Sequence, residues 1–226
     1  MTLPASAGPD GGAGWVGNWS PGIGDPTIVG WVTVGAYFAA AFLCWRAFRR
    51  SSEPGPSAGK LMLALLAALA GARGRLATLS DRDRLRALWL GLTMVLVLLG
   101  INKQLDLQTA FTEGARLLAR SEGWYNDRRP LQLAFILFVA LLGIAALRAV
   151  FLLARGELRR LRAVLGGVLF VACFVVIRAA SFHHIDRLLG TDVGGFKMNW
   201  VIELGGISFI ALGAIRPPGD GGRRPA

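Results

Sequence analysis

The sequence is short of the side chains from which most catalytic sites are built. Its 226 residues include two cysteines, two histidines and 14 acidic residues, against 25 lysines and arginines. Two cysteines provide no disulfide framework. The HExxH, CxxC, Walker and GxSxG motifs are also absent, so no common catalytic motif is complete. His183 and His184 are adjacent, which argues against an intrachain haem held by two axial histidines on opposing helices.

Charged residues are almost missing from five apolar stretches, each close to the length of a membrane span. Hydrophobic residues make up 54% of the chain, and the mean hydropathy of +0.50 is too high for an ordinary soluble domain. The stretches lack the alternation of barrel strands, and lipid admits only helices or closed barrels. The sequence therefore predicts an all-α polytopic membrane protein with about five transmembrane helices. They are expected over Ile28–Cys44, Ala87–Asn102, Leu131–Leu147, Ala163–Ile177 and Met198–Ile215.

Basic residues are divided unevenly between the connecting segments. With the N-terminus outside, the inner segments hold nine Lys/Arg over Arg46–Arg86, five over Arg148–Arg162 and three in the tail, against eight outside. This positive-inside bias predicts a periplasmic N-terminus and a cytoplasmic C-terminus. Basic loops beside anionic lipid also account for the net charge of +11. Membrane lipids are thus the expected partners, and no nucleic-acid partner is needed.

The segments outside the spans differ in composition. We expect a flexible periplasmic arm over 1–24, a transmembrane domain over 25–215 with a basic cytoplasmic loop at 51–84, and a disordered cytoplasmic tail over 216–226.

Two shorter patterns predict an amphipathic surface helix on each side of the membrane. Leu61–Ala72 is apolar but too short to span, and residues 103–130 carry apolar side chains at helical spacing. Asp25 before Pro26 is expected to cap the first span. The Gly-Gly pairs at 166–167, 194–195 and 205–206 predict close helix packing or turns rather than phosphate loops.

Polar side chains gather where three of the apolar stretches meet the outer side of the membrane. Ionisable groups near hydrocarbon are costly and are usually kept for a site or a structural pairing. The candidate cluster consists of Asn102, Lys103, Asp106, Arg178, Ser181, His183, His184, Asp186, Asn199 and Glu203.

Two interpretations of this cluster stay open. In the first, Arg178 and Glu203 form a buried ion pair, and an arginine that keeps the carboxylate ionised makes it a poor general acid. In the second, a divalent metal binds His184, Asp106 and Asp186 in a mixed nitrogen and oxygen site. Adjacent helical residues point about 100° apart, so His183 and His184 do not readily bind one metal.

Several motifs also carry a resemblance to a known family. They are Gly-Ile-Gly-Asp-Pro-Thr at 22–27, Leu-Gly-Ile-Asn-Lys-Gln-Leu-Asp-Leu-Gln at 99–108, Gly-Trp-Tyr at 123–125 followed by Arg128-Arg129, and Arg-Ala-Ala-Ser-Phe-His-His-Ile-Asp at 178–186. With them the chain resembles an uncharacterised family of bacterial multi-pass inner-membrane proteins. The similarity covers most of the chain except 51–83 and the tail. It implies a bacterial inner membrane and no established activity.

Two functions follow as hypotheses. The first is a non-catalytic subunit or accessory protein of other membrane subunits, whose polar cluster holds helices together. The alternative is a metal-dependent membrane-embedded hydrolase acting on a lipid or another amphiphile, with His183 or His184 among the metal ligands.

Overall fold

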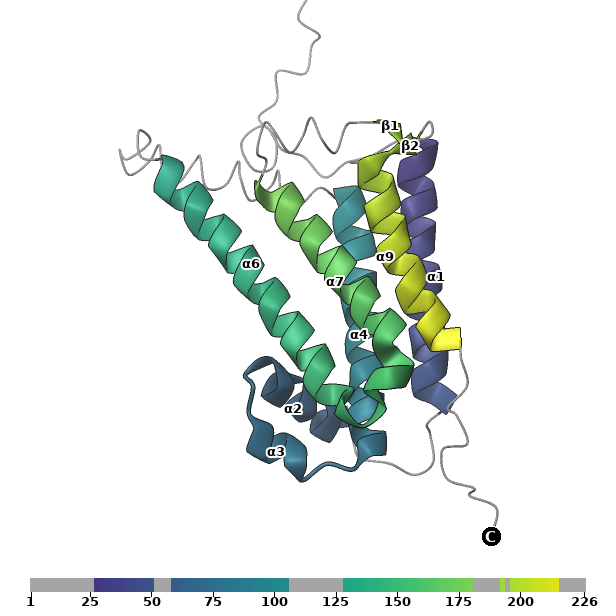
Figure 1. Cartoon of the computed structure of the whole chain (residues 1–226), viewed down its shortest axis with the longest axis vertical. Helices are drawn as coiled ribbons and strands as arrows, with labels where there is room; N and C mark the ends of the chain where they lie inside the picture. The colour runs from purple at the N-terminus through teal and green to yellow at the C-terminus, as the bar shows by residue number, and fades with distance from the viewer. Residues whose placement is uncertain (1–26, 51–57, 106–127, 181–191, 194–195, 216–226) are drawn as a thin grey trace, which may run out of the picture.

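The structure is a computed structural model that describes residues 27–50, 58–105, 128–180, 192–193 and 196–215 (Figure 1). Helices make up nearly all of these residues, which confirms an all-α polytopic membrane protein. The helices are α1 (Ile28–Arg50), α2 (Ala58–Leu69), α3 (Arg73–Ala77), α4 (Asp81–Leu105), α6 (Arg128–Leu153), the 3-10 helix η1 (Arg155–Glu157), α7 (Leu158–Ala180) and α9 (Met198–Ile215). A short antiparallel pair, β1 (Asp192–Val193) with β2 (Phe196–Lys197), precedes α9.

Four helical stretches are long and apolar enough to cross a membrane: Ile28–Arg50, Asp81–Leu105, Leu133–Leu153 and Arg155–Arg178. A fifth helix, α9, has 18 residues and packs along α1 and α7. Its length of about 27 Å nearly matches a hydrocarbon core of about 30 Å. The five expected spans therefore correspond to α1, α4, α6, α7 and α9.

The first four of these helices are longer than the apolar stretches that predicted them. Helix α4 begins at Asp81, where the Ser80 hydroxyl accepts from the Asp83 backbone N–H at 3.2 Å, and α1 continues to Arg50. Backbone hydrogen bonding continues through charged turns that a hydropathy criterion excludes. At its start, α1 is capped by Thr27, whose hydroxyl accepts from the Gly30 backbone N–H at 3.1 Å. Asp25, the expected cap, lies outside the described residues.

The long helices pack in the order α4, α1, α9, α7 and α6, each on the next (Figure 1). Helix α6 is the least integrated of them. Among its described side chains none is buried from Leu133 to Leu147, whereas Ala149, Val150, Leu152 and Leu153 are buried. Helix α6 therefore joins the bundle mainly through its C-terminal end and leans away from α4 at the other (Figure 1).

Helices α7 and α9 approach most closely at glycines. A Cβ atom on Gly167 would lie 2.6 Å from the Gly206 carbonyl oxygen, and one on Gly206 would lie 2.9 Å from Cγ2 of Val171. Only a residue without a side chain fits at such a distance. This confirms close helix packing at one glycine of each pair, Gly167 and Gly206, whereas no atom lies within 4 Å of a Cβ on Gly166 or Gly205. The pair at 194–195 lies outside the described residues.

The direction of the helices defines two ends of the bundle. Helices α4 and α7 finish and α9 begins at one end, which we call the Glu203 end (Figure 1). Helices α1 and α9 finish at the opposite end, the Arg50 end, where Arg50 Nη1 donates to the Ile215 carbonyl at 3.4 Å.

Helix α2 lies at the Arg50 end and packs on α4 and α6. Leu61, Ala64 and Ala68 are buried there, whereas Leu63 and Leu66 are exposed. The helix expected over Leu61–Ala72 therefore exists but starts and ends three residues earlier, and Gly71 follows with a φ of 70°. The second surface helix, expected within the connection 103–130, lies outside the described residues.

Candidate functional site

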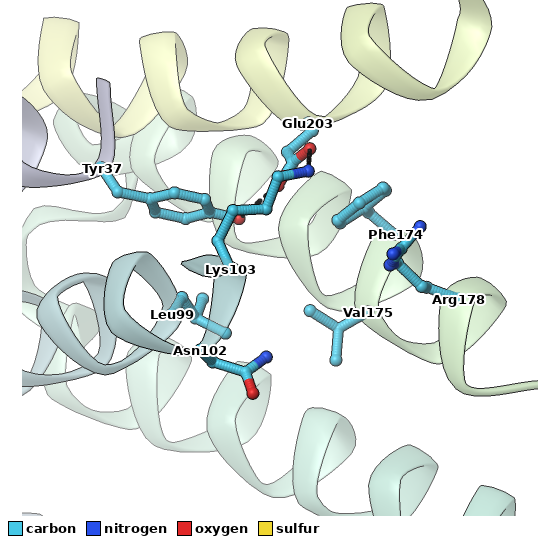
Figure 2. A pocket seen from close by; sticks show the side chains of 8 residues that line it. All are labelled: Tyr37, Leu99, Asn102, Lys103, Phe174, Val175, Arg178 and Glu203. Atoms are coloured by element: carbon cyan, nitrogen blue, oxygen red, sulfur yellow. Dashed lines mark hydrogen bonds and ion pairs between the residues drawn. The ribbon is translucent and has the colours of Figure 1, made fainter. Parts of the chain in front are cut away.

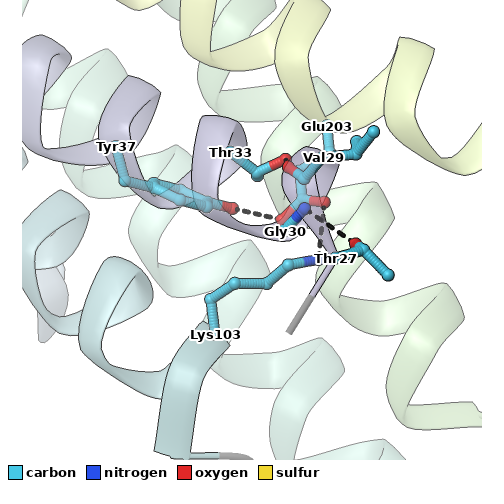
Figure 3. Close-up of polar contacts among 7 residues, drawn as sticks. All are labelled: Thr27, Val29, Gly30, Thr33, Tyr37, Lys103 and Glu203. Carbon is cyan, nitrogen blue, oxygen red and sulfur yellow. Dashed lines mark hydrogen bonds and ion pairs between the residues drawn. The ribbon is translucent and has the colours of Figure 1, made fainter. Parts of the chain in front are cut away.

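A buried carboxylate lies at the centre of the candidate site. Glu203, in the second turn of α9, is 1% exposed. Its Oε1 accepts a hydrogen bond from the Tyr37 hydroxyl of α1 at 3.2 Å, and its Oε2 lies 3.2 Å from Nζ of Lys103, in α4 (Figure 3). Three helices that are distant in sequence are thus joined through one side chain.

The local structure of α1 presents Tyr37 to this carboxylate. Tyr37 follows Thr33 by one helical turn, so the two share a face of α1. Thr33 is fully buried, and its hydroxyl donates to the Val29 carbonyl of the preceding turn at 2.8 Å. The Thr33 hydroxyl therefore has its hydrogen-bond acceptor within α1. The hydrogen bond and the ion pair of Glu203 come from Tyr37 and Lys103 instead.

Lys103 supplies the compensating charge. It lies in the last turn of α4, and only 11% of its side chain is exposed. A buried carboxylate is tolerated only when it is paired and hydrogen-bonded. Glu203 meets both conditions, one at each oxygen.

The expected ion pair between Arg178 and Glu203 is wrong, because Glu203 pairs with Lys103. Lys103 lies in the last turn of α4 and Arg178 in the last turn of α7, and both helices finish at the Glu203 end. Arg178 is exposed, and the Lys103 side chain reaches Glu203 in its place (Figure 2). Depth in the membrane therefore did not identify the cation that pairs with Glu203. The direction in which each side chain leaves its helix decided the pairing.

Beside the ion pair lies a cavity of about 70 Å³ between α4 and α7 (Figure 2). Such a volume holds a few water molecules or one compact polar group. Buried Tyr37, Phe174 and Glu203 form its floor, and exposed Asn102 and Arg178 stand at its rim. The lining is completed by Leu99, Lys103 and Val175.

The structure brings four of the predicted cluster residues to this cavity, namely Asn102, Lys103, Arg178 and Glu203. They come from α4, α7 and α9, so these three helices converge as the sequence predicted. Asn199 belongs to α9, but its side chain is outside the described part of the chain. The remaining members also lie outside it: Asp106, Ser181, His183, His184 and Asp186.

The metal hypothesis depends on residues of that second group. All three expected ligands, His184, Asp106 and Asp186, are outside the described residues. Within the described ranges, no three side chains of His, Cys, Asp or Glu come together as metal ligands. The metal site stays a prediction.

Tyr37 is the residue that sequence reasoning missed. It was assigned to an apolar span, since one phenol hardly changes hydropathy. The available signal was its spacing from Thr33, because two polar side chains four residues apart share a helix face.

Comparisons of the chain with protein-family models, curated proteins and solved structures found no match. The site is therefore interpreted from its own geometry.

Proposed function

We propose that this protein is a non-catalytic integral protein of a bacterial inner membrane, a subunit or accessory protein of other membrane proteins. In this role the Tyr37–Lys103–Glu203 cluster fixes α1, α4 and α9 against one another. The observation that carries the proposal is the state of Glu203: it is 1% exposed, and each of its oxygens already has a partner.

The physical chemistry of the pair favours a structural role. A general acid or base must exchange a proton with a substrate within hydrogen-bond reach. Glu203 is instead held by a cation at one oxygen and by a phenol at the other, so each oxygen already has a partner within the protein. We infer that this buried pair specifies which helices meet and in which register.

The charge distribution supports an orientation. We assign the Arg50 end to the cytoplasm, because the basic segments Arg46–Arg86 and Arg148–Arg162 adjoin it. The Glu203 end then faces the periplasm. Reporter fusions after Arg50 and Arg160 should read cytoplasmic, and a fusion after Gly123 should read periplasmic. A cytoplasmic signal at Gly123 would reverse the assignment.

Metal analysis separates the proposal from the metal-dependent hydrolase. Protein purified in detergent without chelators should contain well below one equivalent of zinc, manganese or iron. The matched variant is His184→Ala, which removes the preferred metal ligand and should leave the metal content unchanged. One equivalent in the wild type that is lost in His184→Ala would overturn the non-catalytic role in favour of the hydrolase.

A further inference from the structure

Two arginines and two aromatic rings form a continuous row at the Arg50 end, from the last turns of α1 to the first turns of α4. Cζ of Arg49 lies 5.9 Å from the centroid of the Trp45 ring, over its face. The Trp45 and Phe48 rings are 5.3 Å apart between centroids, and Cζ of Arg86 lies over Phe48 at 5.3 Å. We call these four side chains the arginine–aromatic row.

Arg86 is the unusual member of the row, because an arginine is almost never buried in a protein without an acidic partner. Its side chain belongs to α4, it is 9% exposed, and its Nε is buried without a hydrogen-bond partner. Asp83, one helical turn earlier, accepts from the Ser80 hydroxyl at 2.8 Å instead. A buried donor in this state indicates a site for a bound ion or water.

The row carries two positive charges. Neither guanidinium is within salt-bridge distance of an Asp or Glu in the part of the chain that the structure describes. Contact with a ring stabilises the charge of an arginine but leaves its N–H groups available, and these groups match the oxygens of a phosphate. The row is therefore complementary to an oxyanion.

The position of the row along α1 indicates where this anion comes from. Trp45 and Phe48 lie in the last two turns of a helix of 23 residues, about 34 Å long against a hydrocarbon core of about 30 Å. Trp45 is 39% exposed, and tryptophan is typical of the headgroup level. A third guanidinium, that of Arg46, lies over exposed Phe42 at 6.0 Å on the same helix. The anions at this level of a membrane are the phosphates of its lipids.

We propose that the arginine–aromatic row binds the headgroup of an anionic phospholipid in the leaflet at the Arg50 end. Arg86 donates to the phosphate where α1 meets α4, Arg49 adds its charge from α1, and Trp45 packs against the glycerol region. A lipid with a net negative charge is favoured over a zwitterionic one, since two cations face it. This inference is independent of whether the protein is catalytic and of which side of the membrane the Arg50 end faces.

The test uses native mass spectrometry of the full chain, delipidated in a sugar-based detergent and titrated separately with dioleoyl phosphatidylglycerol and dioleoyl phosphatidylcholine. Wild type should bind one molecule of phosphatidylglycerol several-fold more tightly than phosphatidylcholine. Arg86→Gln should weaken the binding of phosphatidylglycerol about tenfold. Arg49→Gln alters an exposed side chain and should weaken it about fivefold, even if Arg86→Gln fails to fold.

Matched variants separate the row from a general loss of positive charge. Arg159→Gln removes an exposed cation from the first turn of α7, at the same end of the bundle, and should leave the affinity for phosphatidylglycerol unchanged. Arg86→Lys keeps the charge but loses the planar fork, so its affinity should fall between those of wild type and Arg86→Gln.

Four outcomes would overturn the proposal. Equal affinities of wild type, Arg86→Gln and Arg49→Gln would show that the row does not bind the lipid. Equal affinities of wild type for the two lipids would show that the net charge is not recognised. An equal loss in Arg159→Gln would mean that total charge alone decides the binding. Displacement of the lipid by equimolar inorganic phosphate would identify a site for a free anion instead.

Discussion

Glu203 and Glu157 each face a basic side chain, yet the two ion pairs are placed very differently. Glu203 is 1% exposed and pairs with Lys103 at 3.2 Å across two helices. Glu157 is 40% exposed and pairs with Arg160 at 3.7 Å, three residues along the chain. The first pair holds distant segments together in a medium of low polarity, whereas water and salt screen the second. The contribution of a charge here is set by its surroundings rather than by having a partner.

The largest expected effect comes from leaving Glu203 without its cation. Lys103→Met should lower the free energy of unfolding by about 3 kcal/mol or more, because a buried carboxylate then lacks compensation. The double variant Lys103→Met, Glu203→Leu should recover much of this loss. Thermal unfolding in detergent measures both. The matched change Arg160→Met should cost less than about 0.5 kcal/mol, and equal losses at the two sites would remove the distinction between the pairs.

The next largest loss of stability is expected from a substitution that disturbs the packing of α7 on α9 and changes no charge. Gly167→Ala places a methyl group against the Gly206 backbone, so α7 and α9 must separate at a cost of about 2 kcal/mol. Gly166→Ala is the control, because no atom lies within 4 Å of the added carbon. It should be neutral or stabilising, since alanine favours helix. Circular dichroism melts that coincide for the two variants would argue against the close packing.

A smaller loss of stability is expected when the Tyr37 hydroxyl is removed. Tyr37→Phe leaves Oε1 of Glu203 without its donor, so the free energy of unfolding should fall by about 1–2 kcal/mol. In a Glu203→Leu background, Tyr37→Phe should lower the free energy of unfolding by much less. A double-mutant cycle measures this coupling. Additive losses would mean that Tyr37 acts through packing alone.

The smallest effect is expected at the exposed pair. Glu157→Gln should change the free energy of unfolding by less than about 0.5 kcal/mol, and salt should reduce the difference further. Melting curves at low and high sodium chloride measure it. A loss as large as that of Lys103→Met would show that exposure does not decide the strength of these pairs.

The sequence by itself determined the fold class and the positions of the membrane helices. The apolar stretch Met198–Ile215 coincides with α9, and the other four stretches lie within α1, α4, α6 and α7. This works because a helix in lipid must satisfy its backbone internally and present apolar side chains, and both requirements can be read along the chain. The gathering of Asn102, Lys103, Arg178 and Glu203 followed from the same reasoning, since all four fall where spans meet one face.

Only the tertiary structure decided which of these residues touch. It paired Glu203 with Lys103 instead of Arg178, added Tyr37 from a stretch interpreted only as an apolar span, and placed α6 at the margin of the bundle. Hydropathy gives the depth of a residue along a helix but not the rotation of that helix about its axis or its distance from its neighbours. Those two quantities are set by side-chain packing, here by the close approach of α7 and α9 at Gly167 and Gly206.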